Sequence, residues 1–457
     1  MKHPNLVFVF PDQMRGQAMG FLNEEPVFTP CLNRFATQAL TLTGAAANYP
    51  VCSPYRGMFM TGKYPHANRV LDNCTNQSAA FGVELQTGDI CWSDILNANG
   101  YSLGYIGKWH LDAPHAPYID CSNNEGDVKW NEWCPPHRRH GFDHWYAYGT
   151  YDQHTRPLYW DTDAPREGFQ YVDQWGPEHE ADRAIRYLRN ENGQRNPDAP
   201  FALVVSMNPP HMPYELVPER YGAPYAHLSV EQLCTRPSIP PAGTEWGDYY
   251  RTNIRNYYAM ITGVDEQFGR ILAAIDAAGL AEDTIVVFTS DHGNCLGIHD
   301  AISKNNHYEE SMRVPFVIRW PGRIAAGARD PLLLSTPDIY PTLLDLMGFG
   351  ADVPDAVQGA SHADILQGKE GPRPTSQLYL WMSARHPSEG RRGVRTERCT
   401  LMWSRKGGEE RVLLHDNAAD PYQMTDISAE RPALVAALTE EMNGWLRKTG
   451  DPWLVGP

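Results

Sequence analysis

The hydrophobic positions along the chain follow two alternating patterns. Short apolar runs of the kind found in buried strands occupy residues 6–10, 101–106, 201–206 and 284–289. Segments with helical spacing occupy residues 30–39, 89–99 and 253–278. Thr29 followed by Pro30 is typical of a helix start, and Gly279 is typical of a helix end. Strands that alternate with helices predict an α/β fold with a large, mostly parallel sheet flanked by helices.

Two long stretches between these elements show little periodicity. Residues 112–180 are rich in Trp, His, Tyr, Pro and Asp, and residues 210–250 are similarly irregular. We expect the first stretch to form long loops over a site, or a lid, and the second to lack regular structure as well.

The pattern changes near residue 375. Strand-like runs at 377–382 and 399–403 precede a terminal helix at 432–448. A chain of 457 residues favours one large core plus a smaller unit. We therefore expect a catalytic domain over residues 1–374 and a C-terminal α+β subdomain over residues 375–457.

Composition narrows the class of protein. Hydrophobic residues make up 42% of the chain, which is enough for a packed core. The formal net charge of −16 disfavours a nucleic-acid groove, although a local cluster of Lys, Arg and His can still bind a small anion. No apolar stretch is long enough to span a bilayer and no signal peptide is visible. We expect no membrane partner and a cytoplasmic protein, or a periplasmic or secreted one if the chain has been trimmed.

The cysteines indicate reduced thiols. There are nine of them, an odd number, and none forms a CxxC pair. This usage argues against a disulfide framework, although Cys121 and Cys134 could still pair.

Polar side chains follow each of the four apolar runs. They are Asp12 and Gln13 after the first run, Lys108 and His110 after the second, His211 after the third, and Asp291 and His292 after the fourth. In open α/β sheets, ligands bind outside the carboxyl ends of the strands. The sequence therefore predicts one site at one sheet edge, with side chains suited to a metal and to an anion.

The most specific motif is Cys52-Ser53-Pro54-Tyr55-Arg56, followed by Thr61-Gly62-Lys63-Tyr64-Pro65-His66. Here the chain resembles the formylglycine-dependent (type I) sulfatase family of the alkaline phosphatase superfamily. In that family a formylglycine-generating maturation enzyme oxidises the cysteine of C-x-P-x-R to an aldehyde. The resemblance implies an alkaline-phosphatase-like fold and hydrolysis of a sulfate monoester.

Further segments extend the resemblance over most of the chain. They are the opening strand up to Asp12, Gly107-Lys108-Trp109-His110, Pro210-His211-Met212-Pro213, Ser290-Asp291-His292-Gly293, Lys304 with residues 308–315, residues 338–342, and Asp420-Pro421-Tyr422.

The resemblance also implies the roles of the site residues. Cys52 becomes the nucleophile, and Arg56 orients it. Lys108 and Lys304 bind sulfate oxygens as point charges. His110 is the base for releasing sulfate from the hydrated aldehyde, and His211 binds sulfate or protonates the leaving oxygen.

A divalent metal is expected beside the nucleophile. Asp12, Gln13, Asp291 and His292 are the expected ligands, with residue 52 as a further one. Hard oxygen ligands favour calcium. Many family members carry two Asp at the first metal segment and Asp-Asn at the second, whereas this chain has Asp-Gln and Asp-His. The softer nitrogen keeps manganese or zinc open as alternatives.

Three functions are compatible with these motifs. The leading interpretation is a sulfuric ester hydrolase that acts on a small molecule or glycan, such as a sulfated carbohydrate. The first alternative is a phosphonate monoester or phosphodiester hydrolase, because relatives of that kind share the formylglycine and the Asp-Gln and Asp-His pattern. The second is a binding protein that keeps the fold without maturation of Cys52.

Overall fold

The computed structural model describes residues 3–455, and ten strands within them form one sheet. The strand order is β10 (Ala328–Asp330), β2 (Leu40–Leu42), β9 (Phe316–Arg319), β8 (Thr284–Thr289), β1 (Asn5–Pro11), β7 (Phe201–Met207), β3 (Ser102–Lys108), β4 (His144–Tyr148), β5 (Leu158–Asp161) and β6 (Gln170–Tyr171). The four predicted strands are all present, and they are the central neighbours β8, β1, β7 and β3.

The centre of the sheet is parallel and its margins are not. β8, β1, β7, β3 and β4 run in one direction, with Val9 of β1 opposite Val205 of β7. β9 and β5 join this centre in antiparallel orientation. The prediction of a large, mostly parallel sheet is confirmed, and the carboxyl ends of the central strands meet at one edge.

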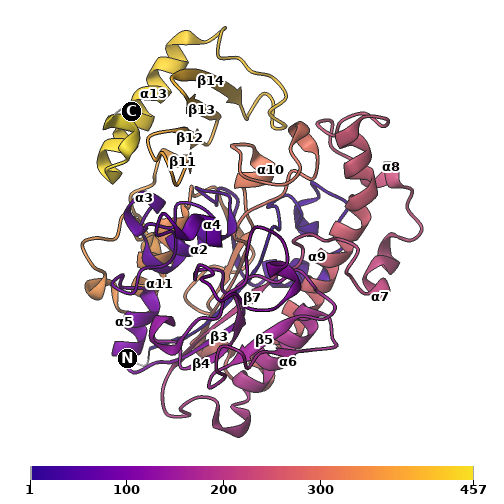
Figure 1. Cartoon of the computed structure of the whole chain (residues 1–457), viewed down its shortest axis with the longest axis vertical. Helices are drawn as coiled ribbons and strands as arrows, with labels where there is room; N and C mark the ends of the chain where they lie inside the picture. The colour runs from indigo at the N-terminus through magenta and orange to yellow at the C-terminus, as the bar shows by residue number, and fades with distance from the viewer. Residues whose placement is uncertain (1–2, 456–457) are drawn as a thin grey trace.

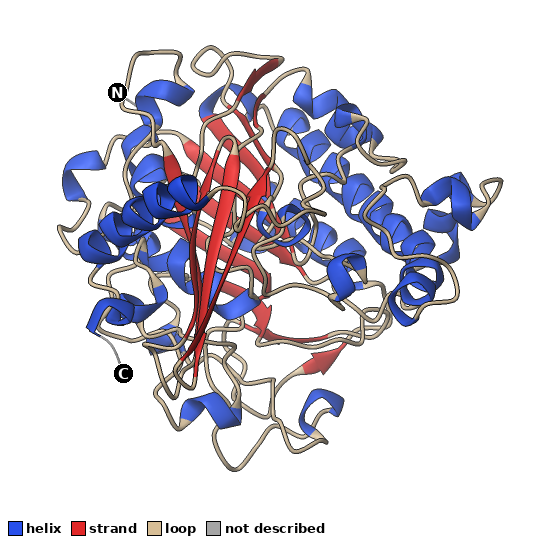
Figure 2. Ribbon diagram, turned by 90° about the horizontal axis from the view of Figure 1, so that it is seen from above, coloured by secondary structure: helices blue, strands red, loops and turns tan. Residues whose placement is uncertain are grey.

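The two faces of the sheet are covered by different helices (Figure 2). Val7 and Val9 belong to one core with α1 (Pro30–Ala36), α6 (Gly176–Leu188) and α9 (Glu245–Ala277). Phe8 and Phe10 belong to the other core with α2 (Cys52–Thr61), α5 (Trp92–Ala98) and α11 (Ile339–Leu346). Because both faces are buried, these strands are continuously apolar rather than alternating.

Two predictions about the irregular stretches need correction. Residues 112–180 are not all loop, because they contain β4, β5, β6 and the start of α6. β4 was missed in the sequence because buried and exposed positions do not alternate along it: Trp145, Tyr146, Ala147 and Tyr148 are all buried. The long helix α9 begins at Glu245, ahead of the predicted residue 253, and the Thr244 hydroxyl caps it by accepting from the backbone N–H of Gly247 at 3.2 Å.

The C-terminal residues form a second, smaller sheet, drawn in yellow tones at the top of Figure 1. It contains the antiparallel strands β11 (Ser376–Met382), β12 (Gly390–Thr396), β13 (Cys399–Lys406) and β14 (Glu409–Asp416), with α13 (Pro432–Thr449) beside it. The α+β character is as predicted, but β12 and β14 were not anticipated because their ends are rich in Arg, Glu and Gly. Whether the chain divides at residue 374 stays a prediction.

The small sheet packs against the helix that begins with the candidate nucleophile. Val51 and Met58, at the start and middle of α2, share a core with Leu378, Leu380 and Leu401 of the small sheet. The remaining short helices are α3 (Pro65–Asn68), α4 (Asn76–Ala79), α7 (Glu219–Gly222), α8 (Val230–Leu233), α10 (Glu309–Met312) and α12 (Ala363–Leu366).

The nine cysteines are all free, Cys121 and Cys134 included. Within the described residues, no helix combines the length and the apolar character needed to cross a membrane.

Candidate active site

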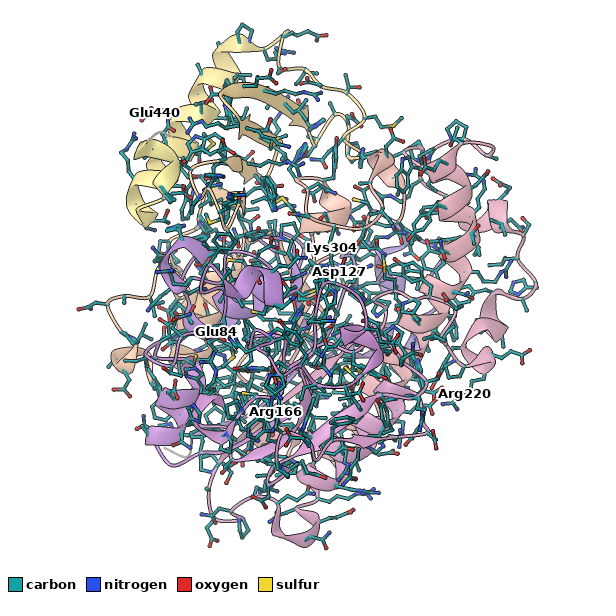
Figure 3. The ribbon with its side chains drawn as sticks, in the orientation of Figure 1. Glu84, Asp127, Arg166, Arg220, Lys304 and Glu440 are labelled. Atoms are coloured by element: carbon teal, nitrogen blue, oxygen red, sulfur yellow. The ribbon has the colours of Figure 1, made fainter. Side chains whose placement is uncertain are left out.

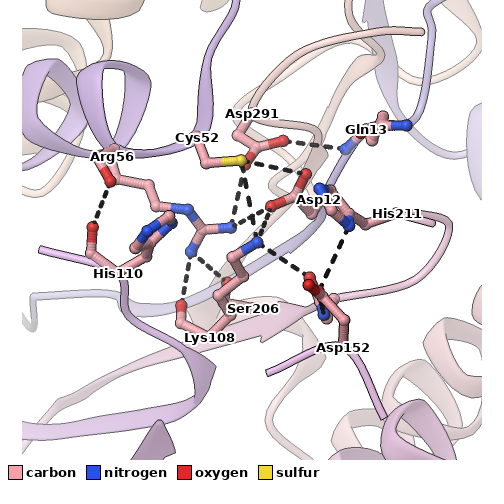
Figure 4. Close-up of polar contacts among 12 residues, drawn as sticks. Asp12, Gln13, Cys52, Arg56, Lys108, His110, Asp152, Ser206, His211 and Asp291 are labelled. Atoms are coloured by element: carbon pink, nitrogen blue, oxygen red, sulfur yellow. Dashed lines mark hydrogen bonds and ion pairs between the residues drawn. The ribbon is translucent and has the colours of Figure 1, made fainter. Parts of the chain in front are cut away.

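Cys52 is the first residue of α2 and lies at the carboxyl edge of the central strands (Figure 4). It is almost fully buried. Its Sγ lies 3.2 Å from Lys304 Nζ and 3.9 Å from Lys108 Nζ. It also lies 3.4 Å from His292 Nε2 and 3.7 Å from Asp12 Oδ1. Burial alone would raise the pKa of the Cys52 thiol, but Lys108 and Lys304 lower it well below its ordinary value. The surroundings of residue 52 therefore stabilise negative charge.

Two buried carboxylates and one imidazole face this sulfur. Ligand atoms of Asp12, Cys52, Asp291 and His292 all lie within 4.8 Å of one another. Burial, and then the negative charge of Asp12, raise the pKa of Asp291 to about 6. Burial opposes ionisation of Asp12 as well, yet Lys108 and Lys304 hold the pKa of Asp12 well below its ordinary range.

His292 is oriented for metal binding. Its Nδ1 lies 2.9 Å from the Gly293 carbonyl oxygen, to which it can donate. Its Nε2 then presents a lone pair toward Asp12 Oδ1, at 3.4 Å. A hydrogen bond from one ring nitrogen commonly fixes the tautomer of a metal-ligating histidine.

Gln13 follows β1 directly, in a left-handed backbone conformation with φ of 71°. Its backbone N–H donates to Asp291 Oδ1 at 3.0 Å, which ties the ends of β1 and β8 together. Its Oε1 accepts from Lys304 Nζ at 3.0 Å, and its Nε2 donates to the Tyr214 hydroxyl at 3.1 Å. The amide oxygen thus points toward Lys304 and the interior of the site.

Lys108 and Arg56 are fixed cations beside the Oδ2 atom of Asp12. Lys108 Nζ lies 2.7 Å from Asp12 Oδ2, and this neighbour outweighs burial and raises the pKa of Lys108. Arg56, one turn after Cys52 on α2, donates to Asp291 Oδ2 at 3.0 Å and to the Lys108 carbonyl oxygen. Its guanidinium also lies over the ring of Phe10. The arginine is therefore held by the ends of three strands.

His110 and His211 differ in exposure. His110 is buried, and among the described residues neither of its ring nitrogens has a hydrogen-bond partner of ordinary length. Burial lowers the pKa of His110 to about 4, so the imidazole is neutral near pH 7. His211 is partly exposed, and its Nδ1 lies 2.7 Å from the Met212 carbonyl oxygen and 3.5 Å from Asp152 Oδ1. Its Nε2 is the nitrogen left to face a substrate.

The geometry therefore gathers Lys108, His110 and Lys304 around the sulfur, with His211 nearby. Comparison with known proteins then decides the family. The family model described as Sulfatase matches residues 4–349.

This chain belongs to the sulfatase family.

A second family model, N-sulphoglucosamine sulphohydrolase, C-terminal, matches residues 297–449. The chain is 36% identical to an endo-4-O-sulfatase of Bacteroides thetaiotaomicron, over 99% of this chain and 93% of the relative. It is 32% identical to an ulvan-active sulfatase of Formosa agariphila, over 98% of this chain and 82% of the relative. A crystal structure from Bacteroides fragilis, named as a candidate sulfatase, superposes with a TM-score of 0.94 at 50% identity, over 99% of this chain and 97% of that one.

These findings confirm the expected family and fold. The protein is a sulfatase, a sulfuric ester hydrolase, and the phosphonate hydrolase alternative is not supported. The roles of the individual site residues are not tested by the comparisons and stay predictions.

Three polar residues of the sulfatase site were missed in the sequence. Ser206 Oγ accepts from Arg56 at 2.8 Å. Asn208 accepts from Lys108 Nζ at 3.0 Å, and its Nδ2 donates to Asp152 Oδ1 at 3.0 Å. Ser206 and Asn208 stand at the end of β7, so the strand-end rule that found His211 could have found them. Asp152 has no local signal, because it lies in a loop after β4.

Proposed function

We propose that this sulfatase hydrolyses sulfate esters of a carbohydrate through a formylglycine made from Cys52. The observation that carries the proposal is the position of Sγ, which lies within 3.9 Å of two lysine ammonium groups and within 3.7 Å of a carboxylate and an imidazole. A sulfate monoester is an anion that repels nucleophiles, so a hydrolase needs cations beside the attacking atom.

A divalent cation fits the donor set. Asp12 and Asp291 would supply oxygens, His292 would supply Nε2, and residue 52 would add an oxygen after maturation, with Gln13 Oε1 within the same site. Burial and the negative charge of Asp12 raise the pKa of Asp291, and a bound cation would offset the repulsion from Asp12. It would also neutralise charge on the substrate, and the predominance of oxygen ligands favours calcium over manganese or zinc.

The formylglycine, once hydrated, supplies one hydroxyl for attack on sulfur and a second hydroxyl through which sulfate can be released. The cations of Lys108 and Lys304 would bind sulfate oxygens. Arg56, fixed by Asp291 and the Lys108 carbonyl, would hold residue 52 in place.

The two histidines suit proton transfers of opposite direction. His110 is neutral near pH 7 and its ring nitrogens lack ordinary partners, so it can accept a proton. His211 reaches the site from the partly exposed side, where a leaving alcohol would lie, and it can donate one.

The carbohydrate substrate is supported by the relatives. The Bacteroides thetaiotaomicron relative is named an endo-4-O-sulfatase, and the Formosa agariphila relative is named an ulvan-active sulfatase. Both alignments cover nearly all of this chain, so they include the site and the loops around it.

The test combines a mass spectrum with a substrate panel. The tryptic peptide from Phe35 to Arg56 should be lighter by about 18 Da than its cysteine form, because oxygen replaces sulfur and two hydrogens. The protein carrying this mass should cleave sulfated sugars faster than matched aryl phosphonates. An unmodified peptide in active enzyme would contradict the formylglycine. Phosphonate cleavage with negligible sulfate cleavage would contradict the sulfate ester.

A further inference from the structure

A cavity of about 670 Å³ lies between the segment 299–308 and the strands of the small sheet. Lys304 lines it, and Lys304 Nζ is the atom 3.2 Å from Cys52 Sγ. Figure 3 labels Lys304 below the C-terminal unit, where the two parts of the molecule meet. Lys304 therefore connects this cavity to the candidate active site.

The lining of this cavity, which we call the basic cleft, is strongly one-sided in charge. Five of its lining residues are cations, and no Asp or Glu is among them: Lys304, Arg391, Arg405, Lys406 and Arg411. The whole chain, in contrast, carries a formal net charge of −16. A local cluster of this kind in an acidic protein indicates an anionic ligand.

Most of these cations are not used to hold the fold. Among the described residues, Arg391, Lys406 and Arg411 form no ion pair with a carboxylate, whereas Arg405 pairs with Glu410 at 2.7 Å. Arg391 is nevertheless positioned, because Nη1 donates to the Asn305 carbonyl oxygen at 2.8 Å and its guanidinium lies 5.5 Å from the ring of Trp381.

Another charged cavity shows the contrast. It is lined by Arg236, Arg313 and Arg395. Each of these arginines is neutralised by a glutamate: Glu310 for Arg236, Glu24 for Arg313 at 2.7 Å, and Glu309 for Arg395 at 2.9 Å. Those arginines serve the packing of the fold, whereas Arg391, Lys406 and Arg411 of the basic cleft have no carboxylate partner among the described residues.

We propose that the basic cleft binds a second anionic group of the substrate, a carboxylate or a further sulfate, on the sugar next to the one that carries the scissile sulfate. The substrate class is then a polyanionic glycan. Arginine suits this role because its planar guanidinium binds carboxylate and sulfate oxygens in pairs. The half-buried ring of Trp381 adds an apolar wall to the cleft. This inference rests on the proposed cleavage of carbohydrate sulfates.

The test uses a matched pair of disaccharides. One joins a uronic acid to a sulfated N-acetylhexosamine, and the other is its methyl ester, which has the same shape without the carboxylate charge. A third substrate replaces the acid by a neutral hexose with a second sulfate, which separates the two anionic groups. The wild-type enzyme should prefer the acid over the ester by about tenfold in kcat/KM, the size of one charge-assisted contact.

Arg391→Gln and Arg411→Gln should each remove most of this preference, because each should raise KM for the acid more than KM for the methyl ester. Arg411 is exposed, so its variant should fold normally. The control is Arg398→Gln, which removes an arginine of the same sheet that pairs with Asp416 at 2.9 Å outside the cleft. It should keep the full preference.

A measurement of binding affinity distinguishes a failure of this inference from a failure of the proposed function. Titration calorimetry with the Cys52→Ala variant measures affinity for the acid and for the ester without turnover. Suppose that the wild-type enzyme cleaves neither sugar, but that the acid binds more tightly than the ester and that Arg391→Gln removes this difference in affinity. The assignment of the basic cleft is then supported and the proposed reaction is wrong. If wild type shows no preference in turnover or in affinity, or if the Arg391 and Arg411 variants keep it, the basic cleft is overturned.

Discussion

Cys52 is surrounded by both cationic and anionic side chains, which is the defining feature of this site at the scale of single residues. The ammonium groups of Lys108 and Lys304 lie within 3.9 Å of the sulfur, and ligand atoms of Asp12, Asp291 and His292 lie within 4.8 Å of it. Of the nine thiols, Cys52 is the one whose pKa is lowered well below its ordinary value, while burial raises the pKa of Cys74 and Cys295. The surroundings of residue 52 therefore favour a negatively charged side chain at this position.

We expect Cys52→Ala to abolish sulfate ester hydrolysis and leave the fold intact. The change removes the precursor of the nucleophile but only one small group from the core, so the free energy of unfolding should fall by about 1 kcal/mol. Steady-state assays and urea denaturation measure the two quantities. Cys399→Ala is the control, because Cys399 is equally buried but lies in the small sheet. Turnover by the Cys52→Ala protein near the wild-type rate would rule out the nucleophile assignment.

Removal of the divalent cation should destabilise the protein as well as inactivate it. The cation would offset the repulsion between Asp12 and Asp291, which are both buried. At a hundredfold excess over its Kd, a ligand of the folded state adds about 2.7 kcal/mol to the free energy of unfolding. Thermal unfolding after chelation, and after separate addition of calcium, manganese or zinc, measures this effect. We expect the largest recovery with calcium, and unchanged stability after complete removal would contradict the site.

At the scale of elements, β3 places Lys108 beside Asp12 only because residue 107 is glycine. Gly107 has a φ of +100°, which disfavours other residues. A Cβ built on it would lie 2.1 Å from the backbone oxygen of Ser206 on β7. The close approach of the two strands at this point is what brings Lys108 beside Asp12.

Gly107→Ala should therefore separate β3 from β7 and displace Lys108. We expect a loss of at least about 1–3 kcal/mol in the free energy of unfolding from backbone strain, together with a marked drop in kcat/KM. Gly126→Ala is the control, since a Cβ at Gly126 would meet nothing within 4 Å and its φ is not positive. Equal stability of the two variants would show that the close approach of β3 and β7 does not require glycine at position 107.

The helix α6 carries a buried acid that makes stability depend on pH. Glu180 accepts from the Tyr159 hydroxyl at 3.0 Å, and burial raises its pKa from 4.5 to about 8. Between these two values the folded state binds more protons than the unfolded state. The stabilisation is complete below pH 4.5 and is lost as pH rises through 8.

We expect the wild-type free energy of unfolding to fall by up to about 1.4 kcal/mol per pH unit within that window because of Glu180. Glu180→Gln keeps the acceptor oxygen for Tyr159 and cannot ionise, so this part of the pH dependence should disappear. Urea denaturation of both proteins at pH 6 and pH 8.5 provides the comparison. Parallel pH dependence in the two proteins would place the titration on another group.

At the scale of the whole molecule, the small sheet is attached to the catalytic part by a buried ion pair. Arg395 of β12 and Glu309 at the start of α10 are both buried, and Arg395 Nη2 lies 2.9 Å from Glu309 Oε2. Arg395 also donates to Gln377 Oε1 at 2.8 Å. α10 follows the segment that holds Lys304, so this contact supports one wall of the site.

Arg395→Met should lower the free energy of unfolding by about 3–5 kcal/mol, because it leaves the charge of Glu309 buried without a partner. Arg398→Met is the matched control, because Arg398 is exposed and solvent screens its pair with Asp416. Hydrogen exchange should also increase in β11 and β12 of the Arg395 variant. A change no larger than that of the control would mean that the pair does not join the two sheets.

The sequence by itself determined the central sheet and most of the site. β1, β3, β7 and β8 are continuously apolar because both of their faces are buried. Each ends in the polar residues that the parallel arrangement then collects at one edge, which is why Asp12, Lys108, His211 and Asp291 could be placed together. The C-x-P-x-R motif added Cys52 and Arg56.

Only the tertiary structure decided the parts that depend on contacts between distant segments. β4 is a strand because aromatic residues that lack a local period are buried next to β3. Asp152 reaches the site through Asn208 and His211, which follow a different strand. The basic cleft exists because residues 299–308 pack against Arg391 and Arg411, which follow roughly 80 to 110 residues later in the chain. Such pairings leave no pattern in either segment alone, since the burial and charge of each residue are set by the partner that folding brings to it.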